Sequence, residues 1–325
     1  MGAAAIAAAS VCAAGGAAAQ EYSRDWKRLR SDHFTAVGNG SFAEIRRVLL
    51  EVEGFRRAVL EIFDTRRAAP AVPTTIVVFR DDRSFAPFKP TDSRGERRDT
   101  IAGYFLSGGA THYMAVAMHS DVTRTFSYLF HEYTHALVRA HLGAPPHWLN
   151  EGLAEFFSTV QARPRDRRSV VGLPPVNRLA YLKRERLLPL RELLTFTSVD
   201  TLEGSTERSA TFYAQSWALV HYLLLADGGR HRAAIAAFAS AGPGAPPDAI
   251  VPAALGRSVE ALERDVARYA RQDVFPQTFI ADPEGPPLAR MTQEVMREAD
   301  VAALHDELHR LLQESRRAPA AAPMR

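Results

Sequence analysis

Two histidines one helical turn apart, with a glutamate between them, are the residues of this sequence best placed to do chemistry. His131, Glu132 and His135 form the pattern His-Glu-x-x-His. On a helix, side chains four positions apart lie on the same face, so both imidazoles can bind one metal ion. The glutamate projects from a neighbouring position toward a metal-bound water, where it could act as a base. The pattern therefore predicts a divalent metal site on a helix.

The same residues could also lie on an ordinary solvated helix surface. Apolar side chains recur at helical spacing through this segment and form one face, whereas both histidines fall on the opposite side. The apolar positions are Phe126, Leu129, Phe130, Tyr133, Leu137 and Ala140. Taken alone, the pattern leaves both interpretations open.

A glutamate in the next helical segment supplies a third ligand. Residues 143–146 (Gly-Ala-Pro-Pro) interrupt the chain, and Glu151 follows sixteen positions after His135. Two neutral imidazoles and one carboxylate leave a fourth tetrahedral position for water, as in catalytic zinc sites. Glu155 lies one turn beyond Glu151 and could accept the remaining ring N–H of a ligand histidine. We therefore expect one Zn²⁺ ion, although these ligand types would also admit another divalent metal.

These residues resemble a known group of peptidases. The resemblance is carried by His131-Glu132-x-x-His135 and Trp148-Leu149-Asn150-Glu151-Gly152-x-Ala154-Glu155. They are similar to the gluzincin clan, and most closely to the bacterial peptidase MA-like proteins, relatives of thermolysin and aminopeptidase N. The similarity covers residues 102–225. It implies a zinc metallopeptidase with Glu132 as general base, in which a sheet edge strand packs on a mainly helical metal-binding half.

The resemblance also implies roles for two residues beside the metal. The segment that begins at Tyr213 resembles the helix whose leading tyrosine, in aminopeptidase-like members, donates a hydrogen bond to the oxyanion. Tyr213 is the implied oxyanion donor, and the alternative is a tyrosine that only packs at a helix start. Asn150 is implied to help hold the site, although it could equally be a helix cap.

A substrate-binding edge strand just before the metal helix is the last feature that the resemblance implies. Here it would be residues 111–118, where an extended peptide could add through main-chain hydrogen bonds and contact Thr111, Tyr113 and Ala115. In aminopeptidase N-like enzymes this strand carries a glycine-rich motif with a glutamate that binds the free amino terminus. Residues 107–114 read Ser-Gly-Gly-Ala-Thr-His-Tyr-Met and contain no acid. Endopeptidase action is therefore the expectation.

Hydrophobic periodicity predicts the elements that position these residues. Strands are expected at residues 33–37, 74–79, 102–106 and 112–118, the last two as a hairpin, and helices at residues 42–63, 122–142, 146–160, 210–226, 230–238, 259–271 and 291–312. Strands first and helices later predict an α+β fold. The predicted organisation is a signal peptide at 1–19, an N-terminal mixed α/β segment at 20–100, the gluzincin-like catalytic domain at 101–275, and a linker, amphipathic helix and disordered tail at 276–325.

The first nineteen residues are predicted to be a signal peptide. They are almost entirely small or apolar and end in three alanines, so cleavage is expected after Ala19. No Lys or Arg precedes the apolar stretch, which leaves a disordered Ala-rich leader as the alternative. Lipid anchoring through Cys12 is not favoured, because Val occupies the position before it. The expectation is a secreted or periplasmic protein with no transmembrane segment in the mature chain.

Charge balance argues against a nucleic-acid partner. The chain carries 40 basic and 37 acidic residues, for a net charge of +3, and its charged runs mix both signs. A peptide or protein substrate is the expected partner, and the oligomeric state is not predicted. Two alternatives stay open: a catalytically silent gluzincin-fold protein that binds or scaffolds a partner, and a zinc hydrolase of a non-peptide amide. Glu132 favours an enzyme, because a metal-binding scaffold needs no base.

Overall fold

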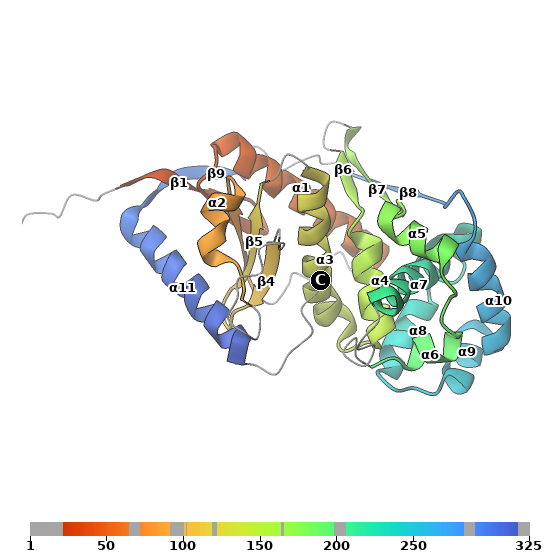
Figure 1. Cartoon of the computed structure of the whole chain (residues 1–325). Coiled ribbons are helices and arrows are strands. Elements are labelled where there is room, and N and C mark those ends of the chain that lie inside the picture. The colour runs from red at the N-terminus through yellow and green to blue at the C-terminus, as the bar shows by residue number, and fades with distance from the viewer. Residues whose placement is uncertain are drawn as a thin grey trace, which may run out of the picture.

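A six-stranded mixed sheet forms one half of the molecule, and helices form the other (Figure 1). The computed structural model describes residues 22–64, 72–91, 101, 103–118, 122–163, 166–197, 206–282 and 290–317. The strands follow the order β4 (Gly103–Ser107), β5 (His112–Ala117), β3 (Thr74–Phe79), β2 (Phe34–Gly38), β1 (Tyr22–Arg30) and β9 (Thr292–Arg297). β2, β3 and β5 run parallel, and the other neighbours pair antiparallel. The predicted α+β class is confirmed.

Strands from all three predicted segments of the mature chain share this sheet. β9 comes from the C-terminal segment and pairs with β1, from Arg30 opposite Thr292 to Tyr22 opposite Arg297. The helix predicted at residues 291–312 therefore starts later, as α11 (Glu298–Arg317). Helical spacing suggested otherwise, but pairing with a strand far away in the sequence outweighs local propensity. The start of the predicted linker also forms a strand, β8 (Thr278–Ala281).

Helices cover both faces of the large sheet. One face packs against α1 (Phe42–Ile62) and α3 (Val122–Leu142), and the other against α2 (Asp82–Phe85), the 3-10 turn η1 (Ala86–Phe88) and α11. Ser41 caps the N-terminus of α1. The Ser41 hydroxyl accepts a hydrogen bond from the Glu44 N–H (3.2 Å), and the Glu44 carboxylate accepts one from the Ser41 N–H (2.7 Å).

The helical half follows α3 along the chain. It consists of α4 (His147–Phe157), α5 (Val176–Arg184), α6 (Leu190–Thr195), α7 (Thr206–Leu225), the 3-10 turn η4 (Ala226–Gly229), α8 (Ala234–Ala241), α9 (Pro247–Leu255) and α10 (Val259–Ala270). A second sheet has the order β6 (Gln161–Arg163), β7 (Arg168–Val171) and β8. β6 and β7 lie between α4 and α5 in the sequence and pack on α1, whereas β8 follows α10.

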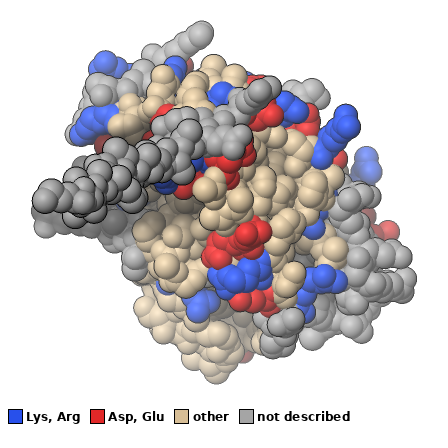
Figure 2. All heavy atoms as spheres, turned by 90° about the vertical axis from the view of Figure 1, so that its left-hand side faces the viewer, with Lys and Arg blue, Asp and Glu red and all other residues tan. Residues whose placement is uncertain are grey.

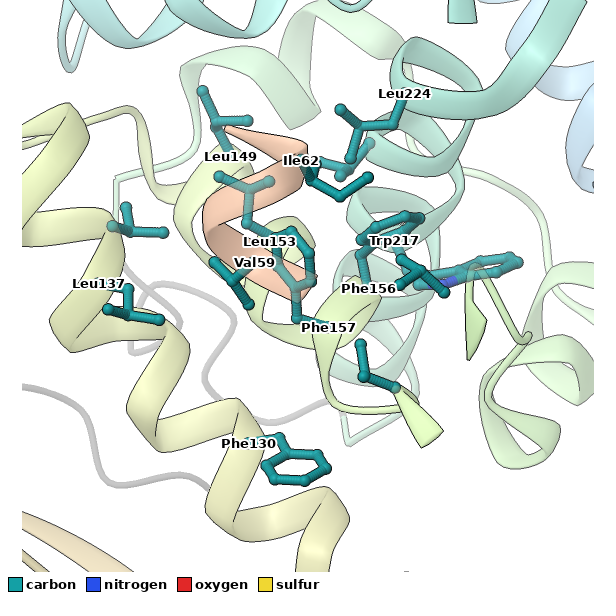
Figure 3. Close-up of a cluster of buried hydrophobic side chains, with 14 of the residues drawn as sticks. Val59, Ile62, Phe130, Leu137, Leu149, Leu153, Phe156, Phe157, Trp217 and Leu224 are labelled. Atoms are coloured by element: carbon teal, nitrogen blue, oxygen red, sulfur yellow. The ribbon is translucent and has the colours of Figure 1, made fainter. Parts of the chain in front are cut away.

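One hydrophobic core joins the two halves through α3. Figure 3 shows side chains from α1, α3, α4 and α7 gathered together, among them Val59, Ile62, Phe130, Leu137, Leu149, Leu153, Phe156, Phe157, Trp217 and Leu224. Burial of apolar surface on this scale stabilises the relative positions of the four helices. The helices that carry the candidate site are therefore fixed to one another and to the sheet.

The face around α11 mixes charges of both signs. Figure 2 shows basic and acidic side chains side by side there, and on α11 Arg310 pairs with both Glu307 and Glu314. Within the described residues, no helix is both long and apolar enough to cross a membrane. The predicted signal peptide, with Cys12 and the cleavage point after Ala19, lies outside the described residues, as do the predicted tail from residue 318 and most of the predicted linker.

Candidate metal centre

The three predicted ligands converge where α3 meets α4. His131 and His135 lie one turn apart on α3, and their Nε2 atoms lie 3.5 and 3.7 Å from Oε2 of Glu151 on α4. Their potential ligand atoms all lie within 4.8 Å of one another. His131 is 4% exposed and Glu151 6%, so the solvated-surface interpretation is wrong for these side chains. The residues that the sequence singled out form a buried group that could hold a metal ion.

A tight connection folds α4 back against α3. Gly143 has a φ of +73°, which glycine adopts without strain, and two prolines follow before α4 begins at His147. Pro146 is the N-cap residue of α4, and its carbonyl accepts hydrogen bonds from the backbone N–H groups of Leu149 and Asn150. The glycine and prolines between the two helices thus set the turn that brings Glu151 to the histidines.

The donor atoms at this site suit a cation. His131 Nε2 and Glu151 Oε2 are buried and have no hydrogen-bond partner among the described residues. Leaving such atoms unpaired costs free energy, which a divalent cation bound by two imidazoles and one carboxylate would offset. Burial alone would raise the pKa of Glu151, but the neighbouring His131 and His135 outweigh it and hold this pKa well below its ordinary value. The carboxylate is therefore charged and ready to bind a metal.

Negative charge surrounds His131 on several sides. Burial lowers the pKa of this imidazole, but the carboxylates of Glu151, Glu155 and Glu132 together raise it above its ordinary value. Glu132 is half-buried on α3 and close enough for its charge to act on both His131 and Tyr213. The predicted base therefore lies at the same site as the predicted ligands.

Glu155 lies beside the site with an unexpected partner. Its Oε1 is 3.9 Å from His131 Nδ1, longer than a hydrogen bond. Instead, the Glu155 carboxylate accepts two hydrogen bonds from Arg178 on α5, from Nε at 3.0 Å and from Nη2 at 2.6 Å. Such a two-point contact fixes both groups. Sequence reasoning missed Arg178, which lies 23 positions after Glu155 in a segment without a recognisable motif.

Tyr213 reaches the site because α7 packs closely on α4. A Cβ added at Gly152 would lie 2.5 Å from the Ser216 carbonyl oxygen, so only glycine allows this approach. The Arg178 guanidinium lies 5.1 Å from the centre of the Tyr213 ring. Burial raises the pKa of Tyr213 most, and Glu151, Glu155 and Glu132 raise it further. Tyr213 thus lies close enough to Glu151 and Glu132 for their charges to act on its hydroxyl.

Asn150 does not cap a helix. It is the fourth residue of α4, and the N-cap position belongs to Pro146. The capping alternative is therefore wrong. Its help in holding the site stays a prediction.

The expected edge strand is an interior strand. β5 pairs with β3 on one side and with β4 on the other, so β4 occupies the edge that was predicted for residues 111–118. The hairpin partner of β5 takes one of its sides, and parallel pairing with β3, which the sequence did not reveal, takes the other. Tyr113 and Ala115 face the layer covered by α11, away from α3. The assignment of these two side chains and of Thr111, which precedes β5, to a substrate edge is therefore wrong.

The other histidines near the site have structural environments. His221 is fully buried on α7, His147 stacks against Phe212 (ring centroids 5.3 Å apart), and His112 lies against Phe105. Within the described residues, the only group of three potential ligands is His131, His135 and Glu151. His119 lies outside those residues.

Part of the chain is similar to a family that has no stated activity. Residues 125–241 match the family model described as "Protein of unknown function (DUF1570)". This interval is less than half of the chain, but it runs from α3 to α8 and contains every residue of the candidate site from His131 to Tyr213. No curated protein matches the chain. The comparisons therefore assign no activity to this chain.

Proposed function

We propose that this protein is an exported zinc-dependent metallopeptidase of the gluzincin type that acts as an endopeptidase. One observation carries the proposal: three ligand atoms from His131, His135 and Glu151 lie within 4.8 Å of one another in a buried site. Glu132, at the position of a general base, lies beside them. Two histidines and one carboxylate are the ligand set of catalytic zinc sites that leave a position open for reaction.

The residues around the ligands suit hydrolysis of an amide. A bound divalent cation would polarise the scissile carbonyl and lower the pKa of a water molecule at the site. Glu132 accepts a proton from that water and passes it to the leaving amine nitrogen. The Tyr213 hydroxyl donates a hydrogen bond to the carbonyl oxygen as negative charge develops there. Its raised pKa keeps this hydroxyl protonated at neutral pH.

Arg178 and Glu155 support the ligand His131. Glu155 lies on the Nδ1 side of the ring, opposite the Nε2 atom that faces Glu151. A carboxylate in that position favours a proton on Nδ1 and leaves Nε2 free to bind the metal. Arg178 holds the carboxylate there through its two hydrogen bonds.

The proposal assigns substrate binding to β4 and not to β5. Among the described strands, β4 has a neighbour on one side only, so its other side has backbone groups for an extended peptide. Phe105 on β4 packs toward the α3 side of the sheet, whereas Tyr104 and Leu106 face the other layer. An added peptide strand would therefore run along the same side of the molecule as the helix that carries the base.

The test compares metal content and cleavage in matched variants. The chain from Gln20 onward is purified as wild type, Glu132→Gln, His135→Ala and the remote control Glu298→Gln on α11. Bound metal is measured by elemental analysis and cleavage with a mixed library of quenched peptides. The proposal expects about one zinc in every protein except His135→Ala, with cleavage only by wild type and Glu298→Gln.

Other outcomes would contradict the proposal in different ways. Zinc in wild type without cleavage of any peptide would favour the binding or scaffold alternative. Zinc together with hydrolysis of small non-peptide amides but not of peptides would favour the amidase alternative. No zinc in the wild type, even after incubation with excess metal, would contradict the proposal that His131, His135 and Glu151 bind a metal ion.

A further inference from the structure

We infer that His221, a buried histidine outside the metal centre, is a positioning residue that holds Arg178 in place through the segment Gly172–Pro175. The inference rests on the metal site of the proposed function, because Arg178 acts there through Glu155. The segment Gly172–Pro175 connects β7 to α5 and is called the strap below.

Both ring nitrogens of His221 are occupied. Nε2 lies 3.0 Å from the Gly172 carbonyl oxygen, and Nδ1 lies 2.7 Å from the Tyr269 hydroxyl. A carbonyl oxygen can only accept, so Nε2 carries the proton and Nδ1 accepts a hydrogen bond from Tyr269. The side chain is fully buried, with the rings of Trp217, Phe156 and Phe275 around it. The imidazole therefore has one orientation, and its donor is aimed at the strap.

The strap begins at a position that only glycine can occupy. Gly172 has a φ of +91°, and an added Cβ would lie 2.4 Å from a Leu225 methyl carbon and 3.0 Å from the Pro276 carbonyl oxygen. The same Cβ would lie 3.3 Å from His221 Nε2. The backbone is thus pressed against α7 at the point where His221 binds it.

The remainder of the strap is stiff. The Thr159 hydroxyl, just beyond α4, donates a hydrogen bond to the Leu173 carbonyl (2.6 Å), so two successive carbonyls of the strap are held from the helical half. Pro174 and Pro175 follow, and proline fixes φ. The Pro175 carbonyl then accepts the first hydrogen bonds of α5, from the N–H groups of Arg178 (3.0 Å) and Leu179 (3.1 Å).

The rigid strap therefore fixes the start of α5 and, with it, the position of Arg178 beside Glu155. Its guanidinium makes two hydrogen bonds to Glu155 and lies over the Tyr213 ring. If His221 releases Gly172, the start of the strap can move and α5 with it. Arg178 then holds Glu155 less firmly beside His131, and affinity for the metal falls. Partners of this kind behind a ligand typically change metal affinity about 10- to 100-fold.

A double-mutant cycle tests this connection. His221→Phe fills the aromatic site without a nitrogen, His221→Gln keeps one N–H donor, and Arg178→Ala removes the group at the end of the path. Zn²⁺ dissociation constants are measured by competition with a chromophoric chelator at pH 7.5. We expect His221→Phe to weaken zinc binding about tenfold in the wild-type background and less than twofold in Arg178→Ala. His221→Gln should restore binding to within about threefold of wild type.

Hydrogen exchange gives a readout that needs no metal. In the metal-free protein, His221→Phe should speed amide exchange in residues 172–180 but not in α9. If His221→Phe does not fold, Tyr269→Phe takes its place, because it removes only the hydroxyl that donates to His221 Nδ1. Zinc affinity and amide exchange are then measured on that variant. An equal loss of zinc affinity in both backgrounds, or unchanged exchange in the strap, would overturn the inference. If the wild type binds no zinc, the metal centre fails, and exchange in the strap still decides whether His221 holds it.

Discussion

The metal centre and the site around His221 are two buried polar regions that differ in how their hydrogen bonds are satisfied. Both contain histidines on helices, and the side chains of His131, Glu151 and His221 are buried. At His221 every ring nitrogen has a protein partner, whereas at the metal centre His131 Nε2 and Glu151 Oε2 have none among the described residues. Satisfied polar groups hold a fold together, and unsatisfied ones that face each other mark a place for a ligand.

The largest expected effect is on metal binding, and Glu151→Gln measures it. Loss of one of three ligands should weaken zinc binding about a thousandfold or more. Without metal, Glu151→Gln should lower the free energy of unfolding in urea by up to a few kcal/mol at neutral pH, because the neighbouring histidines stabilise the charged carboxylate. Zinc at about 100 times the wild-type dissociation constant should stabilise wild type by about 2.7 kcal/mol and leave Glu151→Gln unchanged. Equal zinc stabilisation of both proteins would contradict the ligand assignment.

Glu132→Gln should affect the rate without affecting the metal. Removal of the general base is expected to lower kcat about 10²- to 10⁴-fold, while the zinc dissociation constant stays within about threefold of wild type. Initial rates on a single cleaved peptide, together with the chelator assay, give both quantities. A variant that loses zinc and rate together would show that Glu132 acts as a ligand.

Tyr213→Phe should have a smaller effect, confined to kcat. Loss of one hydrogen bond to the developing oxyanion is expected to lower kcat about 10- to 100-fold, with KM and zinc affinity nearly unchanged. The matched control is Tyr222→Phe, nine residues further along α7, where the hydroxyl accepts a hydrogen bond from Arg257. A similar kcat in wild type and Tyr213→Phe would show that this tyrosine has only a packing role.

The smallest expected effect is the contribution of His221 to the pH dependence of the free energy of unfolding. Burial lowers the pKa of His221 to about 4, from an ordinary value of 6.5. The unfolded chain therefore binds more protons than the folded one between these values, and the free energy of unfolding should fall as pH drops from about 6.5 to about 4. Urea unfolding of metal-free wild type and His221→Gln at pH 7.5, 6 and 5 should show a steeper fall for wild type, by up to about 2 kcal/mol at pH 5. Parallel curves would contradict this assignment.

The sequence predicted the part of the site that depends on local spacing. Helical geometry alone places His131 and His135 on one face, and a nearby second helix needed only a turn to bring Glu151 to them. Arg178 could not be found in this way, because its contact with Glu155 depends on the path of β6, β7 and the strap between them. The spacing of apolar residues does not predict how the backbone runs between Glu155 and Arg178.

The same limit explains the errors in the fold. The longest helices and the central strands were predicted because each has its own pattern of apolar residues, whereas the short helices α5, α6 and α9 were not predicted. The position of β5 inside the sheet and the pairing of β9 with β1 are contacts between distant segments, and the sequence pattern does not encode strand order. The edge of the sheet was therefore assigned to β5, whereas among the described strands β4 lies there.

Zinc titration of the metal-free wild-type chain by calorimetry tests the central claim most directly, with His135→Ala as the matched control. The account predicts binding of one zinc per chain in wild type, and binding too weak to detect in the variant. Absence of binding in wild type, or equal binding in both proteins, would contradict a metal centre formed by His131, His135 and Glu151.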